Sequence, residues 1–257
     1  MSTIQTLSAF YFNTKVESTN YALDFDEGGG EIQASLDIGD YTMEELATEI
    51  ARAMNVVGGQ TYTCTLNRTT RIYTISASSN FSLLSFTGSR LGSSIWSTIG
   101  YVTTSDKTGA NTYDGDNASG SEYRPQFILK DYIARDDFRV KEDAVVNRAV
   151  SGEIQSVTYG DGARIQMEIN LITNKTGLNQ SYFYSNATGK ADALTFMNYL
   201  ITKSKVEFMP DVSTRSTYYK VILESTEESD TGTQFSLKNM QVPDFYTTGP
   251  LIFREIS

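Results

Sequence analysis

Few side chains in this sequence are suited to chemistry. The chain has no histidine and a single cysteine, Cys64. The absence of histidine excludes Ser–His–Asp and Cys–His catalytic arrangements and removes the commonest metal ligand. One cysteine allows no internal disulfide and no cysteine-rich zinc site. Because Cys64 alternates with Tyr62 and Leu66, we expect it to be a small core residue and not a nucleophile.

Paired carboxylates are the remaining candidates for acid–base chemistry. A glycosidase needs two carboxylates that face each other across a cleft at a defined separation. The pairs in this chain are instead sequence neighbours in an expected helix start, a polar connector and an acidic turn: Glu44-Glu45, Asp136-Asp137 and Glu227-Glu228. We interpret them as solvated faces, with the first pair compensating a helix dipole. The sequence therefore predicts that the protein is not an enzyme.

Two loops resemble ligand-binding motifs without meeting their requirements. Residues 28–30 are three glycines, but acidic residues flank them and a strand is expected to follow, whereas a phosphate loop needs a helix N-terminus. Residues 114–117 begin like a calcium loop, but Ala118 and Ser119 replace the oxygen ligand and the glycine of an EF-hand. We predict a hairpin turn and a solvated loop, with no metal and no cofactor. An irregular calcium site is the minor alternative for the second loop.

Charge and composition narrow the possible partners. The chain has 257 residues, with 21 Lys and Arg against 31 Asp and Glu, a formal net charge of −10. A field of this sign repels phosphate backbones and anionic membranes, so we expect no nucleic-acid binding. No stretch approaches the ~18 apolar residues of a membrane-spanning helix. The N-terminus lacks the regions of a signal peptide. The sequence thus predicts a soluble protein without membrane insertion.

One helix gives the clearest local signal. Thr42 and Glu45 form a T-x-x-E capping box, which Tyr41 and Leu46 flank as a hydrophobic staple. Glycines 58 and 59, free to take positive φ, are expected to end this helix. Its apolar residues recur at helical spacing, at Met43, Leu46, Ala47, Ile50 and Met54.

The other expected elements are mainly strands, because apolar and polar residues alternate along them. In the first half they cover 21–26, 32–38, 61–66, 72–77 and 81–86. One turn of helix is expected at 94–99 and a polar loop at 103–120. In the second half the expected strands include 164–172, 206–209, 218–225 and 251–253. A second helix is expected at 190–203, with Leu194, Met197, Leu200 and Ile201 on its apolar face.

These elements predict an α+β protein, mainly antiparallel β, with two domains that each pack sheet strands around one amphipathic helix. We assign residues 1–20 to an N-terminal arm, 21–120 to an α+β module and 121–257 to a β-rich domain. Aromatics in or beside loops are typical anchors of protein–protein contacts. The expected interface residues are Phe10, Tyr11, Phe12, Tyr113, Tyr182, Tyr184, Phe245 and Tyr246.

The first half resembles a module of tailed-bacteriophage virion proteins. In that module a YT…LA..I…LN helix precedes YT.T…TISSS..F.LL and LGF…D.TGA segments. The matching segments here are YTMEELATEIARAMN at 41–55, YTC at 62–64, YTIS at 73–76, NFSLLSFTG at 80–88, IGY at 99–101 and DKTGA at 106–110. The second half, through GEIQ at 152–155, VEFMPD at 206–211 and LES at 223–225, resembles phage proteins of tail or baseplate type.

The resemblance implies a non-enzymatic virion structural protein of the tail tip or baseplate, similar to distal tail proteins. Such a protein is made in the host cytoplasm, oligomerises into a ring and contacts other tail or baseplate proteins. We then expect neighbouring chains to bury Tyr11, Phe12 and the loop at 103–120. Two alternatives stay open: a head–tail connector, neck or capsid decoration protein, and a carbohydrate-binding module. The latter would recognise host glycans through Trp96, Tyr101 and residues 114–122.

Overall fold

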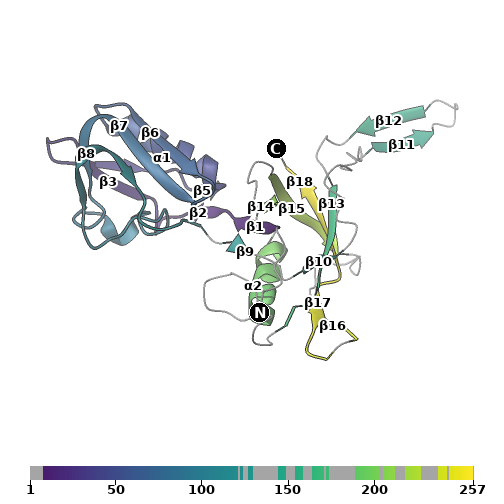
Figure 1. Cartoon of the computed structure of the whole chain (residues 1–257). Coiled ribbons are helices and arrows are strands. Elements are labelled where there is room, and N and C mark those ends of the chain that lie inside the picture. The colour runs from purple at the N-terminus through teal and green to yellow at the C-terminus, as the bar shows by residue number, and fades with distance from the viewer. Residues whose placement is uncertain are drawn as a thin grey trace. The chain divides into compact units, whose positions relative to one another are not determined.

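The chain folds into two compact units (Figure 1). Residues 12–121 form one unit, here called the inserted unit, and residues 1–11 with 122–257 form the other, the divided unit. The chain leaves the divided unit after Tyr11 and returns at Glu122, and these two residues are partners in one strand pairing. The computed structural model describes residues 8–120, 122–123, 127–129, 144–148, 154–158, 164–170, 172–173, 189–202, 205–211, 218–226, 237–241 and 243–256.

The predicted fold class, α+β and mainly antiparallel β, is confirmed in both units. The inserted unit contains a five-stranded sheet in which β7 pairs with three other strands. Its members are β3 (Ala22–Asp26), β4 (Glu31–Ser35), β6 (Tyr62–Asn67), β7 (Ile72–Leu83) and β8 (Lys107–Asp114). A smaller sheet pairs β2 (Thr14–Val16) with β5 (Gly39–Tyr41).

Helix α1 (Met43–Val57) forms for the reason that its sequence predicts. The Glu45 amide donates to the Thr42 hydroxyl and the Thr42 amide donates to the Glu45 carboxylate, which confirms the capping box. The predicted apolar stripe is its buried face. Gly58 ends the helix with φ −78°, so the expected positive φ is wrong there. Glycine is needed because a Cβ would lie 2.7 Å from the Tyr62 ring.

The end of α1 is attached to strand β6 by one side chain. The Asn55 amide group donates to the Tyr62 carbonyl at 2.8 Å and accepts from the Tyr62 amide, also at 2.8 Å. A side chain thus replaces a strand partner at the edge of β6 and satisfies both backbone groups there. At the start of the helix, Glu44 forms an ion pair with Arg68 in the β6–β7 turn.

Three predicted elements of the inserted unit differ from the structure. Strand β7 runs unbroken through 78–80, where two strands were expected, although the register of its pairing with β8 shifts between Ser76 and Phe81. The expected loop at 103–120 contains β8, whose Thr, Asn and Gly residues leave only Tyr113 buried. The segment 94–99 is a single hydrogen-bonded turn, in which the Ile99 amide donates to the Ile95 carbonyl at 3.1 Å, and the regular helical residues are those of the preceding 3-10 turn, η1 (Leu91–Ser93).

The divided unit is built on a seven-stranded sheet in the order β10-β13-β18-β15-β14-β1-β9. Its strands are β1 (Ala9–Phe12), β9 (Glu122–Tyr123), β10 (Phe127–Leu129), β13 (Arg164–Asn170), β14 (Val206–Met209), β15 (Tyr219–Thr226) and β18 (Pro250–Glu255). Two hairpins, β11 (Ala144–Arg148) with β12 (Ile154–Thr158) and β16 (Lys238–Asn239) with β17 (Tyr246–Thr247), complete the described strands.

Aromatic rings fill the core of the divided unit. The Phe10 ring centroid lies 4.7 Å from that of Phe196, 5.0 Å from Phe208 and 5.6 Å from Phe253. The first strand therefore belongs to this unit, and the prediction of a separate N-terminal arm over residues 1–20 is wrong there. Phe196 lies on α2 (Gly189–Ile201), drawn beside the sheet in Figure 1. The buried face of α2 is Ala193, Phe196, Met197 and Leu200, so the prediction for Leu194, which is 37% exposed, is wrong.

Candidate interaction site

Four of the eight predicted interface residues lie in the core of the chain. Phe10, Tyr11, Phe12 and Tyr113 are at most 8% exposed. The Tyr113 ring packs edge-on against Phe81, with centroids 5.0 Å apart, and its hydroxyl donates to the Phe81 carbonyl at 2.6 Å. The packing of this chain accounts for these aromatics and leaves them little surface to offer to a partner.

The other four predicted residues divide into two pairs. Phe245 and Tyr246 are half-buried at the start of β17, where the Tyr246 backbone exchanges hydrogen bonds with Ile172. Tyr182 and Tyr184 lie outside the described residues, as do Asp136-Asp137 and Glu227-Glu228. The structure thus brings no set of predicted interface residues together on one surface of the described chain.

Trp96 and Tyr101, the proposed glycan platform, are 0% and 1% exposed. Their rings pack edge-to-face with centroids 5.4 Å apart, and the Tyr101 hydroxyl donates to the Tyr113 carbonyl at 2.8 Å. A sugar stacks on an exposed ring face, and these two rings expose none. The glycan alternative therefore loses its platform.

The acidic residues of the calcium-like loop at 114–117 take part in other interactions. Asp114 accepts a hydrogen bond from the Thr74 hydroxyl. Asp116 accepts a hydrogen bond from the Val102 amide and forms an ion pair with Lys107. Within the described ranges, no group of three or more His, Cys, Asp and Glu is arranged to hold a metal ion. Cys64 is only partly buried, so the expected core position is wrong. Desolvation still raises the pKa of its thiol to about 12, which keeps it protonated at neutral pH.

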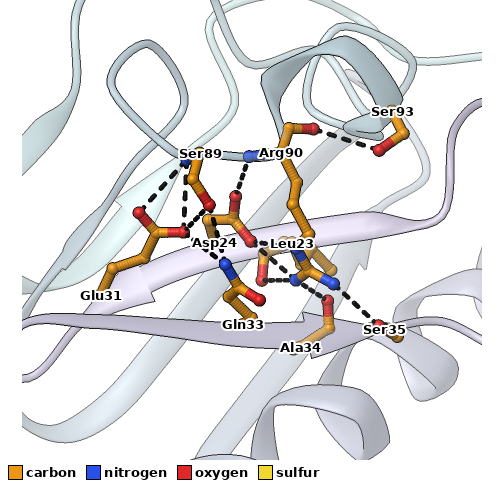
Figure 2. A network of polar contacts seen from close by, with 9 residues as sticks. All are labelled: Leu23, Asp24, Glu31, Gln33, Ala34, Ser35, Ser89, Arg90 and Ser93. Atoms are coloured by element: carbon orange, nitrogen blue, oxygen red, sulfur yellow. Dashed lines mark hydrogen bonds and ion pairs between the residues drawn. The ribbon is translucent and has the colours of Figure 1, made fainter.

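A polar network joins the β3–β4 hairpin to the loop that follows β7 (Figure 2). Asp24, 2% exposed, accepts hydrogen bonds from the Arg90 amide at 2.8 Å, from Nε at 2.8 Å and from Nη2 at 2.7 Å. The same guanidinium donates to the Ala34 carbonyl at 2.6 Å and to the Ser35 hydroxyl at 2.9 Å. The planar fork of arginine suits this arrangement, because it reaches a carboxylate and the neighbouring strand at once.

The loop closes around Asp24 so tightly that Gly88 has no room for a side chain. A Cβ at Gly88 would lie 2.7 Å from the Leu84 carbonyl oxygen and 2.9 Å from the Asp24 Cβ. The Leu84 amide donates to the Asp24 carbonyl at 2.9 Å, and the Ile95 amide donates to the Ala22 carbonyl at 3.0 Å. Backbone and side-chain bonds together fix residues 84–95 along β3.

Glu31 holds the same loop from the next strand. Its carboxylate accepts hydrogen bonds from the Ser89 amide and hydroxyl and from the Gln33 side chain, as Figure 2 shows. The bond from the Ser89 hydroxyl is the main reason that the pKa of Glu31 is lowered. The charged form of Glu31 is therefore the one that holds the loop in the folded protein.

Asp106 fixes the tip of this loop from the other side. It accepts hydrogen bonds from the Phe86 amide at 2.7 Å, from the Thr87 amide at 3.0 Å and from the Thr87 hydroxyl. Burial alone raises the pKa of the Asp106 carboxyl, but these bonds outweigh it and the pKa is lowered. The Ser85 hydroxyl also donates to the Ser105 carbonyl at 2.9 Å. Residues 85–87 thus form a turn with a defined shape.

Phe86 projects from this turn and is 50% exposed. Among the side chains whose burial the structure describes, it is the only exposed aromatic one. The turn is here called the Phe86 turn, residues 85–88 with Asp106. It is suited to binding, since it presents an apolar ring on a fixed backbone.

The sequence prediction missed this feature because residues 81–86 fit a strand pattern. Only the first part of the pattern is strand, since β7 ends at Leu83. The available signal was the Ser85-Phe86-Thr87-Gly88 segment, whose Ser, Thr and Gly residues are typical of turns. An aromatic in the middle of such a segment is a candidate for exposure.

Comparison with known proteins gives no relative for this chain: no protein-family model matches it, and neither does any curated protein. In the part of the chain that the structure describes, no helix is long and apolar enough to cross a membrane.

Proposed function

We propose that this chain is a non-enzymatic structural component of a tailed-bacteriophage virion. It belongs to the tail tip or baseplate, oligomerises into a ring and docks neighbouring tail proteins. The proposal starts from the sequence resemblance of the segments between residues 41 and 110. The observation that supports it most is that these segments are joined in a single unit, the inserted unit, where each has a structural role.

The residues that carry the resemblance are those on which the inserted unit depends. The YT…LA…I segment supplies the capping box and the buried face of α1, and the Tyr73 hydroxyl of the YTIS segment donates to the Met43 carbonyl at 2.8 Å. The NFSLLSFTG segment ends in Gly88, and the DKTGA segment begins with Asp106. Because the resembling segments together build one folding unit in this chain, they support the interpretation of residues 41–110 as one module.

Ring assembly is assigned to the divided unit. Strands β10 and β9 end its seven-stranded sheet, and exposed strand edges pair readily with other chains. In a closed ring, each subunit uses one such surface to meet a different surface of the next subunit. The half-buried Phe245 and Tyr246 are the remaining described candidates for aromatic anchors of this contact.

Mass spectrometry of dissected virions, combined with immunogold labelling, tests this proposal. Tails separated from heads are expected to contain the chain at a ring stoichiometry, with gold particles at the distal end. Labelling of heads or necks would instead favour the connector or decoration alternative. Absence from both fractions would overturn the virion assignment.

A further inference from the structure

We propose that the Phe86 turn docks into an apolar pocket on another protein, and that lysine or arginine residues border this pocket. This inference rests on the proposed function, because it takes the chain to be part of an assembly. It adds the contact residue and the chemistry of the partner surface.

The geometry of the turn favours an anchor over an incidental exposed ring. Hydrogen bonds to Asp106 fix the amides of Phe86 and Thr87, and the Asp24–Arg90 pair fixes the loop behind them. A fixed turn loses little conformational entropy when it binds, so more of the free energy of ring burial contributes to affinity. Aromatic residues in this setting are typical binding hot spots.

The charge of the inserted unit decides between the possible partners. Residues 12–121 contain 13 Asp and Glu against 6 Lys and Arg, a formal net charge of −7. Ion pairs within the unit hold basic side chains that could offset this charge: Lys15, Arg52, Arg68, Arg90 and Lys107. The Asp106 carboxylate lies 2.7 Å from the Phe86 amide nitrogen. A second copy of this unit would meet it with charge of the same sign, whereas a basic rim is complementary.

A photo-crosslinking experiment in assembled virions tests the inference. Phe86 is replaced by the photoreactive p-benzoylphenylalanine, which preserves an aromatic ring, and the matched control places it at Val56, which is 68% exposed on α1. We expect position 86, and not position 56, to crosslink to one other virion protein, at a peptide with apolar and Lys or Arg residues. No crosslink above the control, or a crosslink to a second copy of this chain, would overturn the inference. If the chain is present in virions but silent at position 86, only this inference fails; if the chain is absent, the proposed function fails.

Affinity measurements with the purified partner then distinguish the contribution of the Phe86 ring from that of the fixed turn. Phe86→Ala is expected to weaken affinity by at least about 30-fold, as for a binding hot spot. Val56→Ala is expected to change it by less than about 2-fold, and rising salt is expected to weaken the wild-type complex. Asp106→Asn keeps the ring but loosens the turn, so its loss of affinity should lie between these two. Equal affinities of wild type and Phe86→Ala, with unchanged thermal unfolding of the variant, would contradict the proposal.

Discussion

In the divided unit a phenylalanine, Phe10, contacts three other phenylalanine rings, whereas in the inserted unit an ion pair between Asp24 and Arg90 lies at the centre of the loop contacts. Apolar burial holds the first arrangement and depends little on pH or salt. Carboxylates that accept backbone N–H groups hold the second, through Asp24, Glu31 and Asp106. Three acidic side chains of the inserted unit thus hold its loop contacts. We infer that ring packing holds the contacts around Phe10, whereas an ion pair and hydrogen bonds to carboxylates hold the loop that carries Phe86.

The largest expected effect is that of Phe10→Ala on the divided unit. Removing a fully buried phenylalanine leaves a cavity among three rings and should lower the free energy of unfolding of that unit by about 4 kcal/mol. Hydrogen exchange followed by mass spectrometry is expected to show faster exchange in β14, β15 and β18 and unchanged protection of α1 and β6. Equal loss of protection in both units would contradict the expectation that Phe10→Ala affects the divided unit alone, since it would mean that the two units unfold together.

The converse variant is Arg90→Ala, which leaves the Asp24 carboxylate buried without its guanidinium. Breaking a buried ion pair by removing one partner should destabilise the inserted unit by about 3 kcal/mol. Arg90→Lys serves as the matched control, because it keeps the charge but cannot make the forked contacts with Asp24 and Ala34, and an intermediate loss is expected. Urea unfolding, monitored by hydrogen exchange in β3 and β4, measures the loss of stability in both variants. An Arg90→Ala protein as stable as wild type would contradict the role of the network.

Acid should weaken the inserted unit through its loop-holding carboxylates. The pKa values of Glu31 and Asp106 are lowered in the folded state from 4.5 and 3.8, so they contribute stability above those values. This stability is lost as the pH falls through the depressed folded-state pKa values. Exchange at the amides of Phe86, Thr87 and Ser89, corrected for intrinsic rates, should therefore show falling protection below about pH 4.5. Glu31→Gln with Asp106→Asn should flatten this dependence; an unchanged profile would contradict it.

The smallest effect concerns the capping box of α1. Thr42→Ala removes the hydroxyl that accepts a hydrogen bond from the Glu45 amide. It should lower the free energy of unfolding by about 1 kcal/mol. Thr42→Ser keeps the hydroxyl and is expected to unfold within a few tenths of a kcal/mol of wild type. If both variants lost the same free energy in thermal unfolding, the methyl group, not the hydrogen bond, would be responsible.

The residues changed in these variants differ in how far the sequence alone predicts their contacts. The capping box acts over three residues and β14 matches its predicted range of 206–209, because both signals are local. The Asp24–Arg90 contacts join residues 66 apart, and no spacing rule connects them. Strand β8 escaped prediction because its side chains are nearly all exposed. Phe86 escaped because a fixed turn depends on Asp106, which lies 20 residues away.

Cryo-electron microscopy of the intact virion tests the central claim most directly. We predict that the chain forms a ring at the tail tip or baseplate, with Phe86 of each copy buried in an apolar, basic-rimmed pocket of a neighbouring protein. A virion map that contains the chain elsewhere than in the tail would contradict the proposed location. A tail map in which Phe86 is exposed in every copy would contradict the proposed mode of docking.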